Sequence, residues 1–192
     1  MKIEQLRFSY TDGETEKTVF DGLDLQSDSR IICFMGRSGC GKTTLLHILA
    51  GLLKPASGTI SGFPDRVSVM FQEDRLLPWL NAYENVALVQ PGPLVRRRNQ
   101  EDRASELLKE LDIDPSMAID SMSGGMKRRV SLARALAFGS DALILDEPFK
   151  GMDTELVARA AELIRKQDRI TLVSTHSEDE ARALGAEIIR LP

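Results

Sequence analysis

Cysteine, histidine and tryptophan are scarce in this sequence. Its 192 residues include two cysteines, two histidines and one tryptophan. The cysteines, Cys33 and Cys40, lack the paired spacing of a zinc site and are too few for a disulfide framework. This usage predicts neither a cysteine-based metal centre nor a disulfide-stabilised fold, and it fits a reducing compartment.

Long apolar runs are also missing. No stretch approaches the roughly 20 apolar residues that span a bilayer. Residues 1–10 lack the basic start and apolar middle of a signal peptide. We therefore expect a soluble, cytoplasmic protein without a membrane span of its own.

The sequence has no strong excess of charge of either sign. It contains 25 basic and 29 acidic side chains, for a net charge of −4. Non-specific binding to nucleic acid depends on a basic surface, so we expect no nucleic-acid partner. A chain of 192 residues is suited to one domain, residues 1–192, with a buried core.

One glycine-rich segment has a specific chemical meaning. Residues 36–43 read Gly-Arg-Ser-Gly-Cys-Gly-Lys-Thr and match the phosphate-binding pattern G-x-x-x-x-G-K-[ST] at every fixed position. An apolar run at 31–35 precedes the segment, and a helical pattern at 44–50 follows it. An ordinary glycine turn before a helix is the alternative, but it does not explain this combination. The sequence predicts a phosphate-binding loop.

The residue types in this loop suit ATP with Mg²⁺. Glycine permits positive φ angles, which turn a row of backbone N–H groups onto phosphate oxygens, and the start of a helix also favours an anion. Lys42 can reach the β- and γ-phosphates, and the Thr43 hydroxyl can hold Mg²⁺. The predicted ATP-binding segment consists of Gly36, Arg37, Ser38, Gly39, Cys40, Gly41, Lys42, Thr43 and Thr44.

Two carboxylates follow a later apolar strand. The run Leu143–Leu145 ends at Asp146 and Glu147. Ligands of parallel sheets bind at the carboxyl ends of the strands. Asp146 can help to hold Mg²⁺, and Glu147 can accept the proton of an attacking water. Two acids at a strand end are a weak signal alone and a strong one beside a phosphate-binding loop.

Hydrophobic periodicity predicts an α/β fold. We expect two antiparallel N-terminal strands at 2–10 and 19–25, joined by a turn at 11–13. Further strands and helices then alternate, which predicts a parallel sheet covered by helices. The expected strands are 31–35, 59–61, 67–71, 142–145, 170–174 and 187–191, and the expected helices are 44–50, 82–89, 100–111, 124–138, 154–167 and 177–184. The prediction is a P-loop NTPase core with a mostly parallel sheet, helices on both faces, a small N-terminal antiparallel part and a helical insertion subdomain at about 73–140.

A third motif points to a family. Ser123-Gly124-Gly125 opens a helical pattern ahead of the acidic strand. With the phosphate-binding loop and the two acids, it makes the chain resemble the ATP-binding-cassette (ABC) ATPases from about residue 3 to residue 189. The resemblance implies that two copies pair head to tail, so that Ser123, Gly124 and Gly125 of one contact the ATP of the other. Met122 and Met126 replace the leucine and glutamine that usually flank this motif, while Ser123 and Gly125 are kept.

The resemblance assigns four more residues singly. Tyr10 resembles the aromatic residue that stacks on adenine, although it could also be a strand residue facing the core. Gln72 resembles the glutamine that touches Mg²⁺ and reports to the membrane partner, and Asp153 resembles the aspartate of the loop after the acidic strand. His176 resembles the switch histidine at the γ-phosphate; alone it would be a capping or surface histidine. The implied catalytic residues are Glu147, His176, Lys42 and Gln72, and the implied metal ligands are Thr43, Gln72 and Asp146.

In this family the cassette hydrolyses ATP to drive transport through a separate membrane permease, at the cytoplasmic face of the membrane. The segment 71–79 resembles importer ATPases for nitrate, taurine and alkyl sulfonates, and an importer would add a solute-binding protein as a partner. Trp79 in this segment is either a core residue or part of a partner surface. A soluble ABC ATPase without a transport role and a small-molecule kinase are the alternatives, and the Ser-Gly-Gly motif argues against the kinase. Three cations at 96–98 are expected to form a solvated loop tip, and a role at a membrane surface or with a partner is the alternative.

Overall fold

A parallel sheet organises the computed structural model, which describes residues 1–13, 15–90 and 102–191. Its strand order is β5-β6-β7-β3-β8, and neighbouring strands in it pair parallel to each other. The strands are β3 (Ile31–Met35), β5 (Val67–Met70), β6 (Ala142–Asp146), β7 (Ile170–Ser174) and β8 (Glu187–Arg190). Their carboxyl ends therefore meet at one edge of the sheet.

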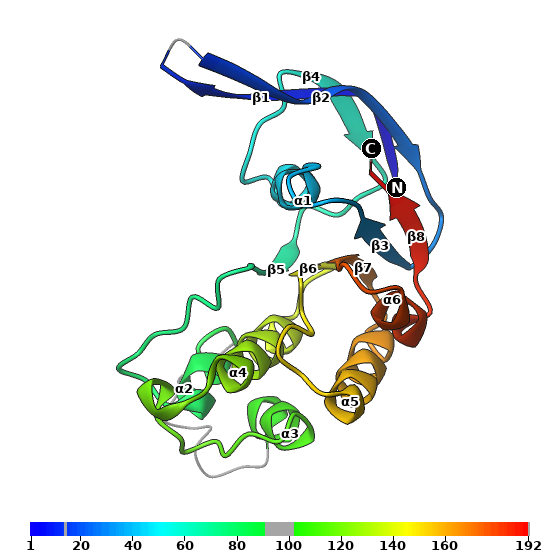
Figure 1. Ribbon diagram of the computed structural model, residues 1–192. Coiled ribbons are helices and arrows are strands. Elements are labelled where there is room, and N and C mark those ends of the chain that lie inside the picture. The colour runs from blue at the N-terminus through cyan, green and yellow to red at the C-terminus, as the bar shows by residue number, and fades with distance from the viewer. Residues whose placement is uncertain (14, 91–101, 192) are drawn as a thin grey trace.

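Helices cover both faces of this sheet. Successive strand residues point to opposite sides, so both faces carry apolar side chains that must be buried. Ile144 and Leu172 pack in the same cluster as the buried leucines of α1 (Lys42–Leu49). Leu143 and Leu145 pack on the other face with residues of α4 (Gly124–Ala137) and α5 (Thr154–Arg165). The second face is completed by α6 (Glu178–Leu184), as Figure 1 shows. The parallel sheet is thus apolar on both sides, as its nearly continuous hydrophobic strands require.

A second, antiparallel sheet lies on the far side of α1 (Figure 1). It has the order β2-β1-β4, with β1 (Lys2–Asp12), β2 (Thr15–Gln26) and β4 (Ser57–Ser61). Ile3, Leu6 and Phe8 of β1 belong to the same apolar cluster as Leu45 and Leu46 of α1. Helix α1 is therefore held between the two sheets.

The predicted turn at 11–13 is wrong at its start. Strand β1 continues through Asp12, and Thr11 and Asp12 pair with Glu16 and Thr15 of β2. Cross-strand pairing therefore overrides the turn preference of Asp12 and leaves Gly13, with a φ of 60°, just beyond the strand end.

The helical part of the chain lies between β5 and β6 in sequence. It contains α2 (Ala82–Ala87), α3 (Arg103–Glu110), the 3₁₀-helix η2 (Ile119–Ser121) and α4. Each α-helix has a side-chain N-cap: Asn81 for α2, Asp102 for α3 and Ser123 for α4. Buried residues of α2, α3 and α4 share one apolar cluster with the sheet face, so these helices pack as a unit against the core. In Figure 1 they lie together below the β5 and β6 strands.

The predicted α/β fold is confirmed, and its boundaries differ by at most four residues, the largest difference being the start of β2 at Thr15 instead of residue 19. Helix α1 begins at Lys42, two residues earlier than the periodicity indicated, because the phosphate-binding loop itself starts the helix. The predicted helix at 100–111 is seen as α3, and its first two positions lie outside the described residues, as does the predicted loop tip at 96–98. Among the described residues no helix is long and apolar enough to cross a membrane.

Candidate nucleotide site

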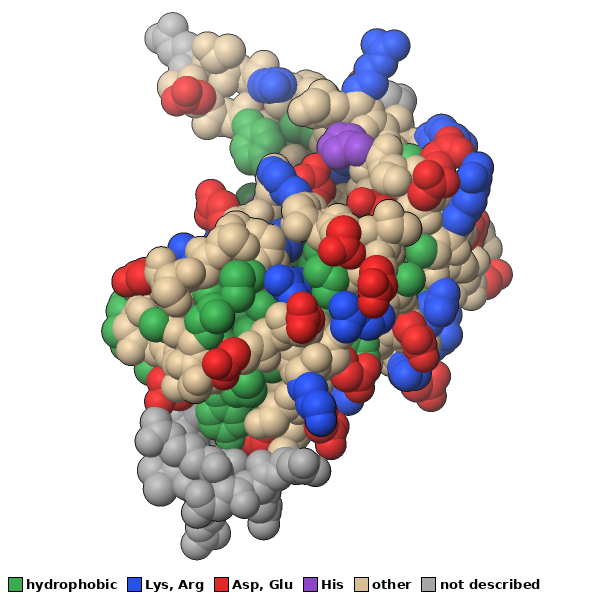
Figure 2. Space-filling model, turned by 60° about the horizontal axis from the view of Figure 1, so that its bottom comes forward, with side chains coloured by type: hydrophobic (Ala, Val, Ile, Leu, Met, Phe, Trp, Pro, Cys, Tyr) green, Lys and Arg blue, Asp and Glu red, His purple; other side chains and the backbone are tan. Residues whose placement is uncertain are grey.

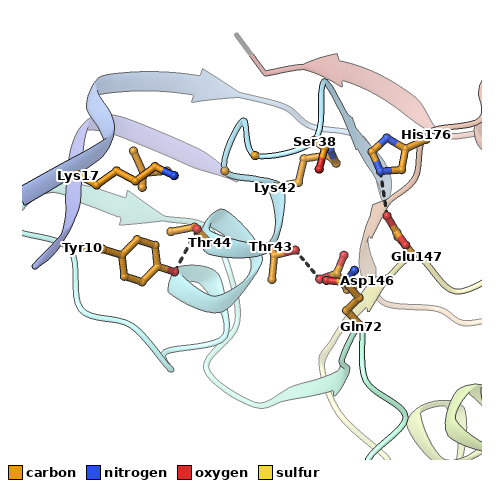
Figure 3. A pocket seen from close by; sticks show the side chains of 13 residues that line it. Tyr10, Lys17, Ser38, Lys42, Thr43, Thr44, Gln72, Asp146, Glu147 and His176 are labelled. Atoms are coloured by element: carbon orange, nitrogen blue, oxygen red, sulfur yellow. Dashed lines mark hydrogen bonds and ion pairs between the residues drawn. The ribbon is translucent and has the colours of Figure 1, made fainter. Parts of the chain in front are cut away.

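A pocket of about 260 Å³ lies at the carboxyl edge of the parallel sheet, beneath the β1–β2 hairpin (Figure 3). Five separate parts of the chain contribute to it: the hairpin, the phosphate-binding loop with the start of α1, the segment after β5, the end of β6 and the end of β7. The lining residues are Tyr10, Lys17, Val19, Ser38, Gly39, Gly41, Lys42, Thr43, Thr44, Gln72, Asp146, Glu147 and His176.

The phosphate-binding loop needs glycine for two reasons. Gly39 and Gly41 have φ angles of 84° and 98°, which side-chain-bearing residues rarely adopt. A Cβ on Gly41 would also lie 2.7 Å from atoms of Val19 and Phe20, so the loop packs directly under β2. Gly39 and Gly41 therefore line the pocket without a side chain that would cover the backbone of the loop.

Lys42 is folded back over this loop. Its side chain is 7% exposed, and its ammonium donates to the carbonyl oxygens of Gly36 at 2.8 Å and Arg37 at 3.0 Å. The Sγ atom of Cys40 lies 3.9 Å from the same nitrogen. The backbone of the loop thus holds the ammonium of Lys42 at the pocket. An anion bound there would contact both this positive charge and the N-terminus of α1.

Asp146 joins the end of β6 to the start of α1. The Thr43 hydroxyl donates to Asp146 Oδ2 at 2.7 Å, and the Ser174 hydroxyl donates to Oδ1. The carboxylate is 4% exposed, while Gln72 lines the pocket beside it. Hydroxyl, carboxylate and amide oxygens are the donors that Mg²⁺ prefers, so these residues fit the metal.

Glu147 and His176 form a contact at one end of the pocket. His176 Nε2 lies 2.9 Å from Glu147 Oε1. The two residues follow β6 and β7, which are neighbours in the sheet, so the parallel pairing places them side by side. Glu147 has a φ of 51°, a left-handed conformation that is uncommon outside glycine.

Tyr10 stands at the opposite end of the pocket (Figure 3). Its ring is 43% exposed, packs edge-on against Phe8 with centroids 4.9 Å apart, and its hydroxyl lies 3.2 Å from Thr44 Oγ1. The alternative that Tyr10 faces the core is therefore wrong.

Sequence reasoning missed Lys17 and Val19. Lys17 lies directly opposite Tyr10 in the β1–β2 pairing, so both side chains stand on the same face of the hairpin. The hairpin register would have found Lys17, because a residue paired with a pocket aromatic must reach the same pocket. A turn predicted at 11–13 gives a different pairing of the two strands, so the register that places Lys17 opposite Tyr10 was not predicted.

Seven predicted site residues do not line this pocket. Ser123 caps α4 by accepting from Met126 N at 3.3 Å, and Asp153 caps α5 by accepting from Leu156 N at 2.9 Å. Gly124 and Gly125 occupy the first turn of α4. Gly36, Arg37 and Cys40 belong to the phosphate-binding loop but are likewise absent from the lining. The pocket of one chain thus combines residues of the phosphate-binding loop with Asp146, Glu147 and His176. The Ser-Gly-Gly motif lies outside it, at the start of α4.

Comparison with known proteins agrees with this geometry. A sequence profile described as ABC transporter matches residues 22–150. The chain belongs to the ABC transporter family. It is 39% identical over 186 residues to the aliphatic sulfonates import ATP-binding protein SsuB of Granulibacter bethesdensis, covering 91% of this chain and 74% of the relative. It is 34% identical over 206 residues to the bicarbonate transport ATP-binding protein CmpD of Synechococcus elongatus, covering 98% of this chain and 74% of the relative.

Solved structures give the same answer for the fold. The chain superposes on the ATP-binding cassette MJ0796 in a dimeric post-hydrolysis state bound to ADP and Pi, with a TM-score of 0.80 and 28% identity. The match covers 99% of this chain and 93% of that cassette. A second dimeric structure of MJ0796 gives a TM-score of 0.85 at 27% identity. The predicted family and P-loop NTPase fold are confirmed, and this cassette is an ATPase subunit of an ABC transporter.

Proposed function

We propose that this cassette binds ATP along the pocket, with the base at Tyr10 and the γ-phosphate at Glu147 and His176. The observation that supports this orientation is the order of side chains in Figure 3. Tyr10 and Lys17 lie at one end, Glu147 and His176 lie at the other, and the phosphate-binding loop lies between them. An aromatic ring suits a base, and the loop amides and Lys42 suit phosphates.

In this orientation Glu147 is the general base of hydrolysis. Its carboxylate accepts the proton of a water attacking in line with the γ-phosphate. Lys42 and His176 stabilise the negative charge that develops on the transferred group. Thr43, Asp146 and Gln72 would hold Mg²⁺, which supplies charge neutralisation at the phosphates when bound.

The Ser-Gly-Gly motif completes the site of a second copy. Ser123 and Gly124 are exposed at the start of α4, away from the chain's own pocket. A serine hydroxyl and free N–H groups at the start of a 14-residue helix favour an anion. We propose a head-to-tail homodimer in which this surface covers the ATP of the partner; the solved dimers of MJ0796 support the pairing of such cassettes.

A permease is the proposed membrane partner, and import is the proposed direction. Trp79, which the sequence left between a core and a partner role, is 76% exposed in the segment before α2, and Leu88 after α2 is 48% exposed. Figure 2 shows hydrophobic side chains gathered over this helical part of the molecule. The names of SsuB and CmpD, which refer to import of sulfonates and transport of bicarbonate, support an importer at the cytoplasmic face with a solute-binding protein, and they argue against a cassette without a transport role.

The substitution Glu147→Gln tests the catalytic role. It keeps the size of the side chain and removes its basicity, so we expect the ATP hydrolysis rate to fall by about 100-fold or more while MgATP binding is retained. Steady-state phosphate release and equilibrium binding of a fluorescent ATP analogue measure the two effects. A variant that hydrolyses ATP at the wild-type rate would remove Glu147 from the role of base.

A further inference from the structure

Arg128 is a buried cation outside the pocket. It lies in the second turn of α4, three residues after Gly125, and is 3% exposed. A buried guanidinium is costly unless its N–H groups are paired. Here they meet four backbone carbonyls and one carboxylate, so the surroundings of Arg128 satisfy its donors.

These acceptors come from two separate parts of the site. Arg128 Nε and Nη2 both donate to the carbonyl oxygen of Glu147 at 3.0 Å, and Nη2 also donates to that of Asp146. On the other side, Nη1 donates to the carbonyl oxygens of Phe71 at 2.7 Å and Gln72 at 3.0 Å, and to Asp74 Oδ1 at 3.0 Å. One side chain of the helical part thus connects the end of β6 with the segment that carries Gln72.

The bonds to Glu147 matter because its backbone is unusual. A φ of 51° is strained for glutamate and persists only where neighbouring groups hold it. The Glu147 N–H donates to Ser174 Oγ at 3.0 Å and to Ser174 O at 3.1 Å, which fixes the amide side from β7. Arg128 fixes the carbonyl side from α4. The carboxylate that contacts His176 is therefore aimed by two anchors.

We propose that Arg128 is a positioning residue for ATP hydrolysis. It holds the Glu147 backbone in its left-handed conformation and at a fixed distance from the backbone of Gln72. This inference rests on the proposed role of Glu147 as base. The hydrogen bonds of Arg128 to Asp146, Glu147 and Gln72 go to backbone oxygens and not to their side chains, so we expect it to act on the rate through Glu147 and not on ATP binding. Because Ser123 caps the start of α4, contact of this helix with a partner's ATP would be transmitted by Arg128 to the cassette's own Glu147.

Arg129 provides a matched control on the same helix. Its guanidinium also donates to backbone carbonyls, those of Leu111 at 2.7 Å and Asp112 at 2.8 Å, but these lie at the end of α3, far in the chain from the strands of the site. Arg128→Met and Arg129→Met each remove a guanidinium that pairs with carbonyls. Only the first removes an anchor of Glu147.

The experiment compares hydrolysis and binding in these variants. Misplacement of a reacting group by about 1 Å can reduce the rate by about 100-fold, so we expect Arg128→Met to lower kcat by about 10- to 100-fold with KM for MgATP within about twofold of wild type. Arg128→Lys keeps the charge but cannot reach both sets of carbonyls, and we expect a smaller loss of kcat. If Arg128→Met does not fold, the kcat of Arg128→Lys alone tests the proposal. Arg129→Met should retain kcat within about twofold.

A double-mutant comparison separates positioning from a general loss of structure. If Arg128 acts through Glu147, then Arg128→Met should change the residual hydrolysis of Glu147→Gln by less than about twofold, while a structural defect would lower both backgrounds equally. Wild-type kcat in Arg128→Lys and Arg128→Met, or equal losses in both backgrounds, would overturn the inference while the role of Glu147 stands. Wild-type hydrolysis in Glu147→Gln itself would overturn both.

Discussion

Tyr10 lies at the end of the pocket where we propose that the base of ATP binds. Its ring is oriented by the edge-on contact with Phe8 and by the approach of its hydroxyl to Thr44, so it is held in place without a nucleotide. Stacking of a base on an aromatic ring contributes about 1–3 kcal/mol. The ring, rather than the hydroxyl, should therefore determine the contribution of this residue.

Two substitutions separate the ring from its hydroxyl. We expect Tyr10→Ala to weaken ATP binding by about 1–3 kcal/mol and Tyr10→Phe to leave it nearly unchanged, because only the first removes the stacking surface. Equilibrium titration with ATP measures both. If Tyr10→Phe weakened binding as much as Tyr10→Ala, the hydroxyl rather than the ring would hold the nucleotide.

The two cysteines should differ in reactivity. Cys33 lies in β3 and is fully buried; burial first, and the charge of Glu180 second, raise the pKa of its thiol to about 12. A raised pKa keeps the thiol protonated at pH 8, and the thiolate is the reactive form. Cys40 lies half-buried in the phosphate-binding loop, beside Lys42.

Alkylation with iodoacetamide at pH 8 tests this difference. We expect the folded protein to incorporate one label, at Cys40, and MgATP to slow that reaction. The second label should appear only after unfolding, and Cys40→Ala should take up none while folded. Equal labelling rates for the two cysteines in the native protein, measured by peptide mass spectrometry, would contradict the burial of Cys33.

At the scale of elements, the start of α4 depends on a close approach of two backbones. A Cβ on Gly125 would lie 2.6 Å from the carbonyl oxygen of Gly151, in the segment between β6 and α5. Outside its own helix and chain neighbours, a Cβ on Gly124 would meet no described atom within 4 Å. The two glycines are adjacent in one helical turn, so they form a matched pair.

Alanine at these positions should have opposite effects. We expect Gly125→Ala to destabilise the cassette by about 1–3 kcal/mol, because the segment carrying Gly151 must move. Gly124→Ala should be neutral or stabilising by up to about 1 kcal/mol, since alanine favours a helix. Thermal unfolding without nucleotide measures both effects, because each kcal/mol of stability shifts the melting temperature by about 2–4 °C. Equal melting temperatures would show that the contact between α4 and Gly151 is not tight.

The elements of the site differ in how far the sequence could predict them. The phosphate-binding loop is local, so Gly39, Gly41 and Lys42 could be placed from eight consecutive residues. Lys17 could not, because its position depends on the hairpin register, and the turn residues favoured the wrong one. Arg128 could not either, since a basic residue in an amphipathic helix is normally exposed, and its burial follows from the packing of α4 against β5 and β6.

At the scale of the whole molecule, the fold brings distant residues to one edge of one sheet. Thr43 and Asp146 are hydrogen-bonded across 103 positions of sequence because α1 and β6 are neighbours in space. The order of the motifs predicted this arrangement, since strand ends of a parallel sheet share an edge. Ser123, Gly124 and Gly125 lie outside the pocket, and their contact with a partner's ATP remains a prediction.

The measurement that tests this account most directly is sedimentation of the Glu147→Gln cassette with and without MgATP. Since ATP would be bound between the phosphate-binding loop of one copy and the Ser-Gly-Gly motif of the other, we predict a monomer without nucleotide and a dimer containing two ATP molecules with it. Ser123→Arg in the same background should bind ATP and stay monomeric. A Glu147→Gln protein that saturates with MgATP and remains a monomer at every concentration would contradict the proposed shared site.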